Sequence, residues 1–326
     1  MFRLKPSSIV ALLFPVFIVC SAILSCTSCG LKQGGGRPET GRLADDTYKR
    51  LRDSIFTNPG YVLAEIDSLQ HDIADDSADY YKLELLRADV LCNGDNSGDK
   101  GVDAYENVHG YCLRNGDKEL EMYYWNYYGN YVLFNLGIRD SARRCYERAY
   151  KLMEETGNRS GFTGLCINLA DAYRAIGRSA RASFYYRRAL SWLDSVGSTE
   201  NLFNVYVGLG QTYAEIANYD EAEGYFKLAG TMLDSVEVYD KFFYHNSYGN
   251  QLYFAHRYND ALRQFESAAA YASELRHPSA RCIAATNMCE VNLMLGNIKE
   301  AHKYLDLAMS WLRQLPNDAL SRFYIY

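Results

Sequence analysis

Small and large apolar residues recur along this chain with a period of about 40 residues. The clearest copy lies in residues 165–190, where Gly177 separates two runs whose apolar residues repeat at helical spacing. Alanines in these runs would let two helices approach closely, and Tyr173 and Tyr186 would fill the space beside them. The stretch therefore predicts a hairpin of two helices.

This hairpin is repeated along the chain. Its first alanine recurs at spacings of 40, 40, 39 and 40 residues, as Ala142, Ala182, Ala222, Ala261 and Ala301. Four residues after each comes a large apolar residue, namely Tyr146, Tyr186, Phe226, Phe265 or Leu305. Three residues later comes a second alanine: Ala149, Ala189, Ala229, Ala268 or Ala308. Repetition at such a fixed period predicts a helical solenoid rather than one globular core.

Five repeats follow this pattern within 119–313, with bounds near 119–154, 159–194, 199–235, 238–274 and 278–313. Each has a predicted turn near one of the residues Gly137, Gly177, Ala217, His256 and Gly296. Polar residues near the starts of the second helices are expected to cap backbone N–H groups: Asp140, Ser179, Asp220, Asp260 and Asn297. Pro278 is expected to open a first helix, where its missing N–H has no cost. Residues 44–113 predict degenerate helical repeats of the same kind, with a polar turn over 93–101.

The pattern resembles the tetratricopeptide repeat (TPR) family. The third repeat carries the likeness best, in Leu209, Gly210, Tyr213, Ala222, Phe226 and Ala229. The period of 40 differs from the 34 typical of the family, as in its long-helix members. The resemblance implies an all-α fold, a TPR-like right-handed α-solenoid of antiparallel helical hairpins. A HEAT-type solenoid has a similar period but lacks this alternation of small and aromatic positions.

The N-terminus predicts a targeting segment. Arg3 and Lys5 precede the uncharged run 9–24, which is shorter than the roughly 20 residues of a membrane span. The tetrad Ile23-Leu24-Ser25-Cys26 resembles the bacterial lipobox, which implies a signal peptide over 1–25 and lipidation of Cys26. Residues 26–43 would then form a flexible tether. The alternatives are an uncleaved anchor helix and an ordinary cleaved signal.

This reading places the protein outside the cytoplasm, anchored by lipid to a bacterial membrane. No acidic cluster follows Cys26, which favours a periplasm-facing protein. The net charge is −6, so the basic face that nucleic-acid binding requires is missing. Six cysteines after the tether are scattered over small or apolar helix positions and predict buried free thiols: Cys92, Cys112, Cys145, Cys166, Cys282 and Cys289.

Catalytic, metal-binding and phosphate-binding motifs are missing from the sequence, which indicates a protein that is not an enzyme and takes no cofactor. The likeness to TPR proteins instead implies an inner groove lined by the first helices. The expected groove residues are Asp171, Arg174, Gln211, Asn246, Asn250 and Tyr253, with Ile167, Val207 and Glu215 on the same faces. The Lys partners of the family's carboxylate clamp are missing beside Asn168 and Asn287.

Tyr124, Tyr127 and Tyr131 lie on one stripe of the first repeat, together with Phe134. Such rings could bind a peptide or a sugar, since they offer large contact area at low entropy cost. They could equally pack between helices, with their hydroxyls bonded to backbone groups. The sequence leaves both interpretations open.

Three functional hypotheses follow. The first is a membrane-anchored scaffold that binds a peptide or protein partner in its groove. The second is the extracytoplasmic sensor of a membrane signalling protein, and the third is a glycan-binding lipoprotein. Pro316 predicts a further, incomplete helix in 314–326, and the apolar end Phe323–Tyr326 predicts further repeats or a partner chain that covers it.

Overall fold

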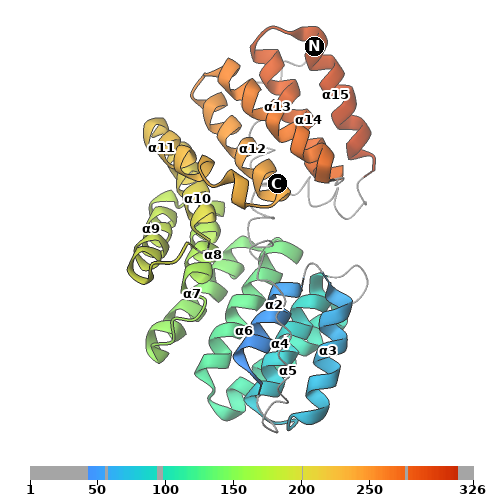
Figure 1. The fold of residues 1–326 in the computed structure, drawn as a ribbon, viewed down its shortest axis with the longest axis vertical. Helices are drawn as coiled ribbons and strands as arrows, with labels where there is room; N and C mark the ends of the chain where they lie inside the picture. The colour runs from blue at the N-terminus through green and yellow to red at the C-terminus, as the bar shows by residue number, and fades with distance from the viewer. Residues whose placement is uncertain (1–42, 56–57, 94–97, 200, 276–277, 315–326) are drawn as a thin grey trace. The chain divides into compact units, whose positions relative to one another are not determined.

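The structure is a computed structural model that describes residues 43–55, 58–93, 98–199, 201–275 and 278–314 (Figure 1). The fold in this part is all-α, a TPR-like series of helical hairpins without strands. Cys26, the segment before it and the predicted helix after Pro316 lie outside the described residues. None of the described helices combines the length and the apolar character that a membrane span requires. The chain divides into two compact units, with the boundary between Ala172 and Tyr173.

The N-terminal unit comprises α2 (Asp45–Ser54), α3 (Pro59–Asp72), α4 (Ala78–Asn93), α5 (Gly98–Asn115), α6 (Lys118–Asn130), α7 (Arg139–Thr156) and most of α8 (Phe162–Ala175). Helices α4 and α5 pack as one pair, and α6 and α7 as the next. The prediction of a polar turn over 93–101 is wrong at its C-terminal end, because α5 already begins at Gly98. Gly101 lies within α5 and close to α4, where an added Cβ would clash with Cys92.

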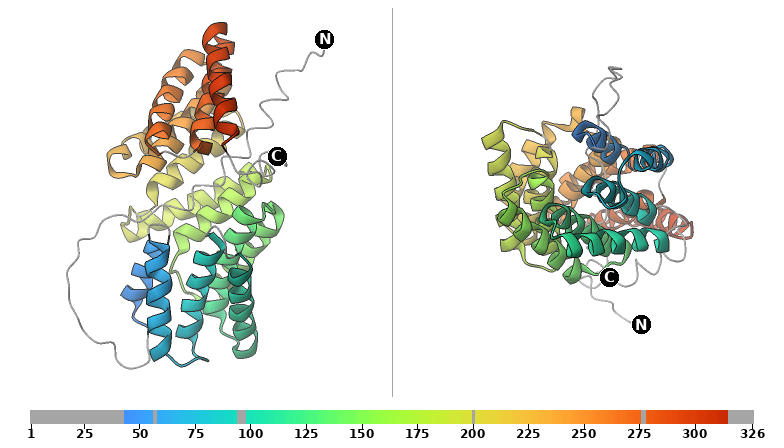
Figure 2. Two further views of the ribbon diagram at one scale, coloured as in Figure 1. Left: turned by 90° about the vertical axis from the view of Figure 1, so that its right-hand side faces the viewer. Right: turned by 90° about the horizontal axis from the view of Figure 1, so that it is seen from below.

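The C-terminal unit continues with α9 (Ser179–Val196), α10 (Leu202–Glu215), α11 (Tyr219–Gly230), α12 (Val238–Phe254), α13 (Tyr258–Leu275), α14 (Pro278–Met294) and α15 (Ile298–Leu312). Consecutive helices pair as α10 with α11, α12 with α13 and α14 with α15. The last four stand side by side in the orange and red part of Figure 2. Pro278 opens α14, as predicted.

The repeating positions form the core of each unit. The first and second alanines of all five repeats are buried, and so are Tyr146, Tyr186, Phe226 and Phe265. Leu305 differs because its side chain is 47% exposed on α15, the last described helix. The six predicted free cysteines are buried and unpaired with one another, which confirms that prediction.

Turn geometry also follows the repeat. The five predicted turn residues all have left-handed backbone angles, with φ of 70° at Gly137, 72° at Gly177, 58° at Ala217, 60° at His256 and 77° at Gly296. The capping prediction is wrong for four of its residues. Asp140, Ser179 and Asp220 lie inside the first turn of their helices, and Asn297 at the N-cap of α15 makes no side-chain cap bond. Asp140 instead pairs with Arg143 and Arg144.

The first repeat contains an irregularity that its sequence did not reveal. A π-helical turn, Tyr131–Asn135, ends the first helix of this repeat. Gly129 lies against Tyr146, 17 residues later, whereas the matching contacts Gly210–Phe226 and Gly249–Phe265 span 16 residues. The π-turn therefore accommodates one extra residue and keeps the glycine opposite the aromatic ring.

Candidate functional site

The repeat places a polar side chain at one equivalent position on several first helices. Gln211 on α10 and Asn250 on α12 each lie 11 residues before the first alanine of their repeats. Asp171 and Glu290 occupy the same position in the neighbouring repeats. Because α10 and α12 pack against each other in the C-terminal unit, Gln211 and Asn250 face a common surface.

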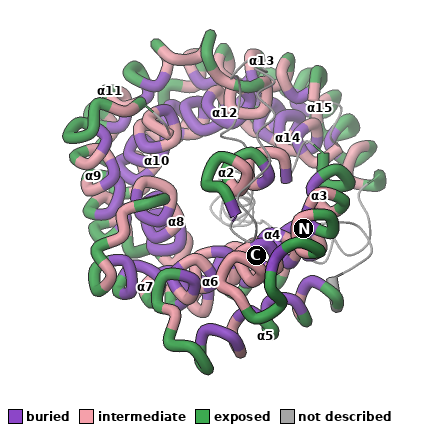
Figure 3. Tube along the Cα trace, turned by 60° about the horizontal axis from the view of Figure 1, so that its bottom comes forward, coloured by how far each residue is buried: buried purple, intermediate pink, exposed green. Residues whose placement is uncertain are grey.

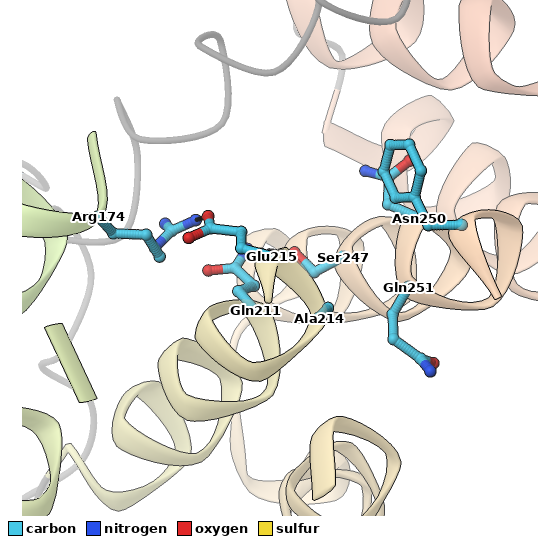
Figure 4. A pocket seen from close by; sticks show the side chains of 8 residues that line it. Arg174, Gln211, Ala214, Glu215, Ser247, Asn250 and Gln251 are labelled. Carbon is cyan, nitrogen blue, oxygen red and sulfur yellow. Dashed lines mark hydrogen bonds and ion pairs between the residues drawn. The ribbon is translucent and has the colours of Figure 1, made fainter. Parts of the chain in front are cut away.

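A pocket opens on this surface, with an empty volume of about 410 Å³ that includes its open mouth. It lies wholly within the C-terminal unit. The lining residues come from the end of α8 and from α10 and α12: Arg174, Gln211, Ala214, Glu215, Ser247, Asn250, Gln251 and Phe254 (Figure 4). Six of these eight side chains are polar, and the other two are Ala214 and Phe254.

Two interactions fix one side of the pocket. The Arg174 guanidinium donates from Nη1 to Glu215 Oε1 at 3.0 Å, and both side chains are largely buried. The second oxygen of Glu215 accepts from Ser179 Oγ at 3.3 Å. Figure 4 shows Arg174 and Glu215 pointing toward each other, so their charges are directed at one another. This charge-assisted hydrogen bond holds both side chains in place in the pocket wall.

Two further hydrogen bonds hold α12 against its neighbours. Gln211 donates from Nε2 to Ser247 Oγ at 2.7 Å, which links α10 to α12. Gln251 points away from the other lining residues in Figure 4 and donates to the Tyr219 carbonyl at 3.3 Å. Gln251 therefore links α12 to the start of α11, while Gln211 and Asn250 remain half-buried at the surface.

Beneath the pocket, α12 and α14 are joined by buried amides. Asn287 donates from Nδ2 to Asn246 Oδ1 at 2.6 Å. Asn246 is fully buried, and within the described residues its own Nδ2 finds no acceptor. Glu290 lies one turn after Asn287 on α14, and burial raises its pKa to about 7. Tyr253 is half-buried nearby, and burial together with Glu290 raises its pKa to about 12.

The structure brings three of the predicted groove residues together, because Arg174, Gln211 and Asn250 line one pocket. Asn246 belongs to the layer beneath the pocket, and Tyr253 lies on the same helix one turn beyond Asn250. Asp171 is 6% exposed and belongs to the N-terminal unit, so it is not part of this pocket.

The tyrosines of the first repeat are placed differently from a binding platform. Tyr124 and Tyr127 are only 5% and 8% exposed. The Tyr124 ring stacks on His109 and on Tyr128, with centroids 4.7 and 5.4 Å apart. Tyr131 is half-buried, 5.8 Å from the Tyr105 ring. These contacts correct the platform interpretation for Tyr124 and Tyr127, whose rings pack between helices.

The short helix α2 provides the reason for the burial of Tyr127. Burial is the main cause of the strongly raised pKa of Tyr127, followed by its neighbour Tyr48 on α2. Leu51 of α2 is fully buried in the same core. Figure 3 shows α2 on the far side of α4 from α5. Tyr48 and Leu51 of the N-terminal helix therefore contribute to the burial of Tyr127, one of the residues that the sequence suggested for ligand binding.

Some pocket residues were not singled out from the sequence. Ser247 lies next to the predicted Asn246, and its Oγ, rather than the Asn246 amide, reaches the pocket. Glu215 was placed on the inner face but not recognised as the partner of Arg174, 41 residues away. The sequence signal that could have pointed to Glu290 was its position 11 residues before the first alanine of its repeat. In the described part of the chain, no group of His, Cys, Asp and Glu is arranged to hold a metal ion.

Comparisons with known proteins agree with this architecture. Residues 163–192 match the model of the tetratricopeptide repeat family. A comparison with curated proteins finds no match. Among solved structures, a Rap protein complexed with competence and sporulation factor is similar with a TM-score of 0.71 and 15% identity, over 85% of this chain and 78% of that chain.

Two further solved structures are similar. NprR in complex with its cognate peptide NprX gives a TM-score of 0.66 at 16% identity, over 83% of this chain and 78% of that chain. A signal-transduction ATPase with a tetratricopeptide repeat sensor, from Pyrococcus horikoshii, gives 0.51 at 13% identity, over 86% of this chain and 44% of that chain. At such identities the likeness shows the fold alone.

Proposed function

We propose that this protein is a non-enzymatic scaffold that binds a peptide or an extended protein segment on the first-helix face of its C-terminal unit. The observation that carries the proposal is the pocket in which Gln211 and Asn250 occupy equivalent positions on adjacent helices. Carboxamides at repeating positions match an extended backbone, which offers donors and acceptors along its length. One similar structure, NprR, is a complex with a cognate peptide, which supports this ligand class.

Binding of a peptide pool tests the proposal. The protein without its predicted signal peptide, residues 26–326, is immobilised and incubated with a pool of random acetylated heptapeptides. Retained peptides are identified by mass spectrometry. Loss of one side-chain hydrogen bond should weaken a retained peptide about two- to tenfold. Asn250→Ala and Gln211→Ala should show this loss, and the exposed Asn259→Ala on α13 should not. Retention of no peptide, or equal affinities of all three variants, would refute the proposal.

We further propose that Cys26 anchors the scaffold to a bacterial membrane outside the cytoplasm. The support is the sequence Ile23-Leu24-Ser25-Cys26 at the end of an uncharged run. Cys26→Ala should abolish incorporation of a fatty-acid analogue and release the protein from the membrane fraction. Unchanged labelling and fractionation would contradict lipidation.

The sensor of a membrane signalling protein is the second candidate. Its specific support is the similarity to a signal-transduction ATPase whose repeat part is named a sensor. An apolar span encoded after Tyr326 in the reading frame would favour this candidate, whereas the scaffold alone needs none. The glycan hypothesis has less support than the other two, because Tyr124 and Tyr127 are buried and Tyr131 alone of the three tyrosines is half-buried.

A further inference from the structure

Glu290 extends the row of polar residues that begins in the pocket. It lies on α14, 11 residues before Ala301, the position that Gln211 and Asn250 hold on the two pocket helices. Asn287 lies one turn before Glu290 and bonds to Asn246, so this face of α14 meets α12. Glu290 also contributes to the raised pKa of Tyr253, which lies near the end of α12.

Among the residues that the structure describes, no cation pairs with the carboxyl group of Glu290. Its Oε1 is buried, and within the described residues no donor reaches it. Glu215, the carboxylate that lines the pocket, is paired with Arg174 and also accepts from Ser179. A buried carboxylate without a partner is unfavourable, and burial accordingly raises the pKa of Glu290. Glu290 therefore differs from Glu215 in that no cation among the described residues pairs with it.

We propose that Glu290 is a subsite for a cation of the bound peptide, either a Lys or Arg side chain or a free amino terminus. The inference rests on the proposed function. A ligand cation at Glu290 would form an ion pair like that of Arg174 with Glu215. In that pair α8 supplies the cation, whereas at Glu290 the ligand would supply it. The negative net charge of the chain, −6, also favours approach of a cationic ligand.

Matched peptides test the subsite. A retained peptide that contains Lys is synthesised with Lys, with Arg, and with norleucine, which keeps the four side-chain carbons of Lys without the ammonium group. Each is made with a free and with an acetylated amino terminus, so that the two sources of positive charge are separated. Affinities are measured by fluorescence polarisation for the wild type, for Glu290→Gln, and for Glu266→Gln as an exposed control on α13.

In the wild type and in Glu266→Gln, removal of the recognised cation should weaken binding about ten- to a hundredfold. In Glu290→Gln, peptides with and without that cation should bind within about twofold of each other. If peptides bind and depend on Asn250 but show no preference for a cation, or if Glu290→Gln keeps the preference, this inference is wrong and the proposed function stands. If no peptide binds to the wild type, both fail.

Discussion

The close approach of α9 and α10 makes Gly208 a sharp test of the repeat packing. A Cβ added at Gly208 would stand 2.2 Å from Cζ and 2.5 Å from the hydroxyl of Tyr186. Tyr186 is 1% exposed, so its ring has no open space to move into. Overpacking of this kind destabilises by about 1–3 kcal/mol.

Alanine also favours a helix over glycine, by about 0.5–1 kcal/mol, and this gain must be separated from the clash. Gly224 supplies the control, because it lies mid-helix on α11 and a Cβ there meets nothing within 4 Å. Gly224→Ala should raise the free energy of unfolding by about 0.5–1 kcal/mol. The difference between the two variants should then isolate the clash, about 1–3 kcal/mol in favour of Gly224→Ala.

Urea unfolding followed by far-ultraviolet circular dichroism measures this difference. The full chain is used for both variants, so that any contribution of the N-terminal unit cancels in the comparison. If Gly208→Ala is as stable as Gly224→Ala, or more stable, Tyr186 does not pack against α10 as described. The alternation of small and aromatic positions would then need another explanation.

Two further predictions concern pH and turn strain. Since burial raises the pKa of Glu290 from 4.5 to about 7, the folded state holds a proton that the unfolded state releases, and stability falls as pH rises between these values. Glu290→Gln should remove this fall. Its free energy of unfolding should therefore gain up to about 3 kcal/mol over the wild type from pH 5 to 8, at about 1.4 kcal/mol per pKa unit. Parallel stability curves for the two proteins would contradict this prediction. Ala217 has a φ of 58°, where the corresponding turn residue Gly177 is a glycine. Ala217→Gly should raise the melting temperature through a gain of about 1 kcal/mol, and Ala214→Gly inside α10 should lower it by a similar amount. A lower melting temperature for Ala217→Gly would show that this turn is not strained.

Much of the fold was predictable because the repeat is encoded by short-range spacing. Ala182 and Tyr186 are one helical turn apart, so their burial on one stripe follows from the sequence alone. The turn residues follow in the same way, since Gly177 and Gly296 interrupt two helical patterns at the same point of the repeat. The buried free cysteines were predictable because each occupies an apolar helix position.

Local polar chemistry was less predictable. Asp140 lies near the start of a helix, and the sequence could not show that Arg143 and Arg144 take its carboxylate away from the backbone. The π-turn at Tyr131–Asn135 was equally hidden, because one extra residue changes no local propensity and becomes necessary only when Gly129 must face Tyr146.

The sequence by itself determined which face of each helix is apolar and where each hairpin turns. Tertiary structure decided which polar residues meet, because these contacts join positions far apart in the chain. Arg174 finds Glu215 41 residues away, and Gln211 finds Ser247 36 residues away. Tertiary structure also determined that Tyr127 belongs to the core rather than to a surface, since it lies in one core cluster with Leu51 of α2. Periodicity specifies a face, but only the packed neighbour determines whether that face is core, pocket or open surface.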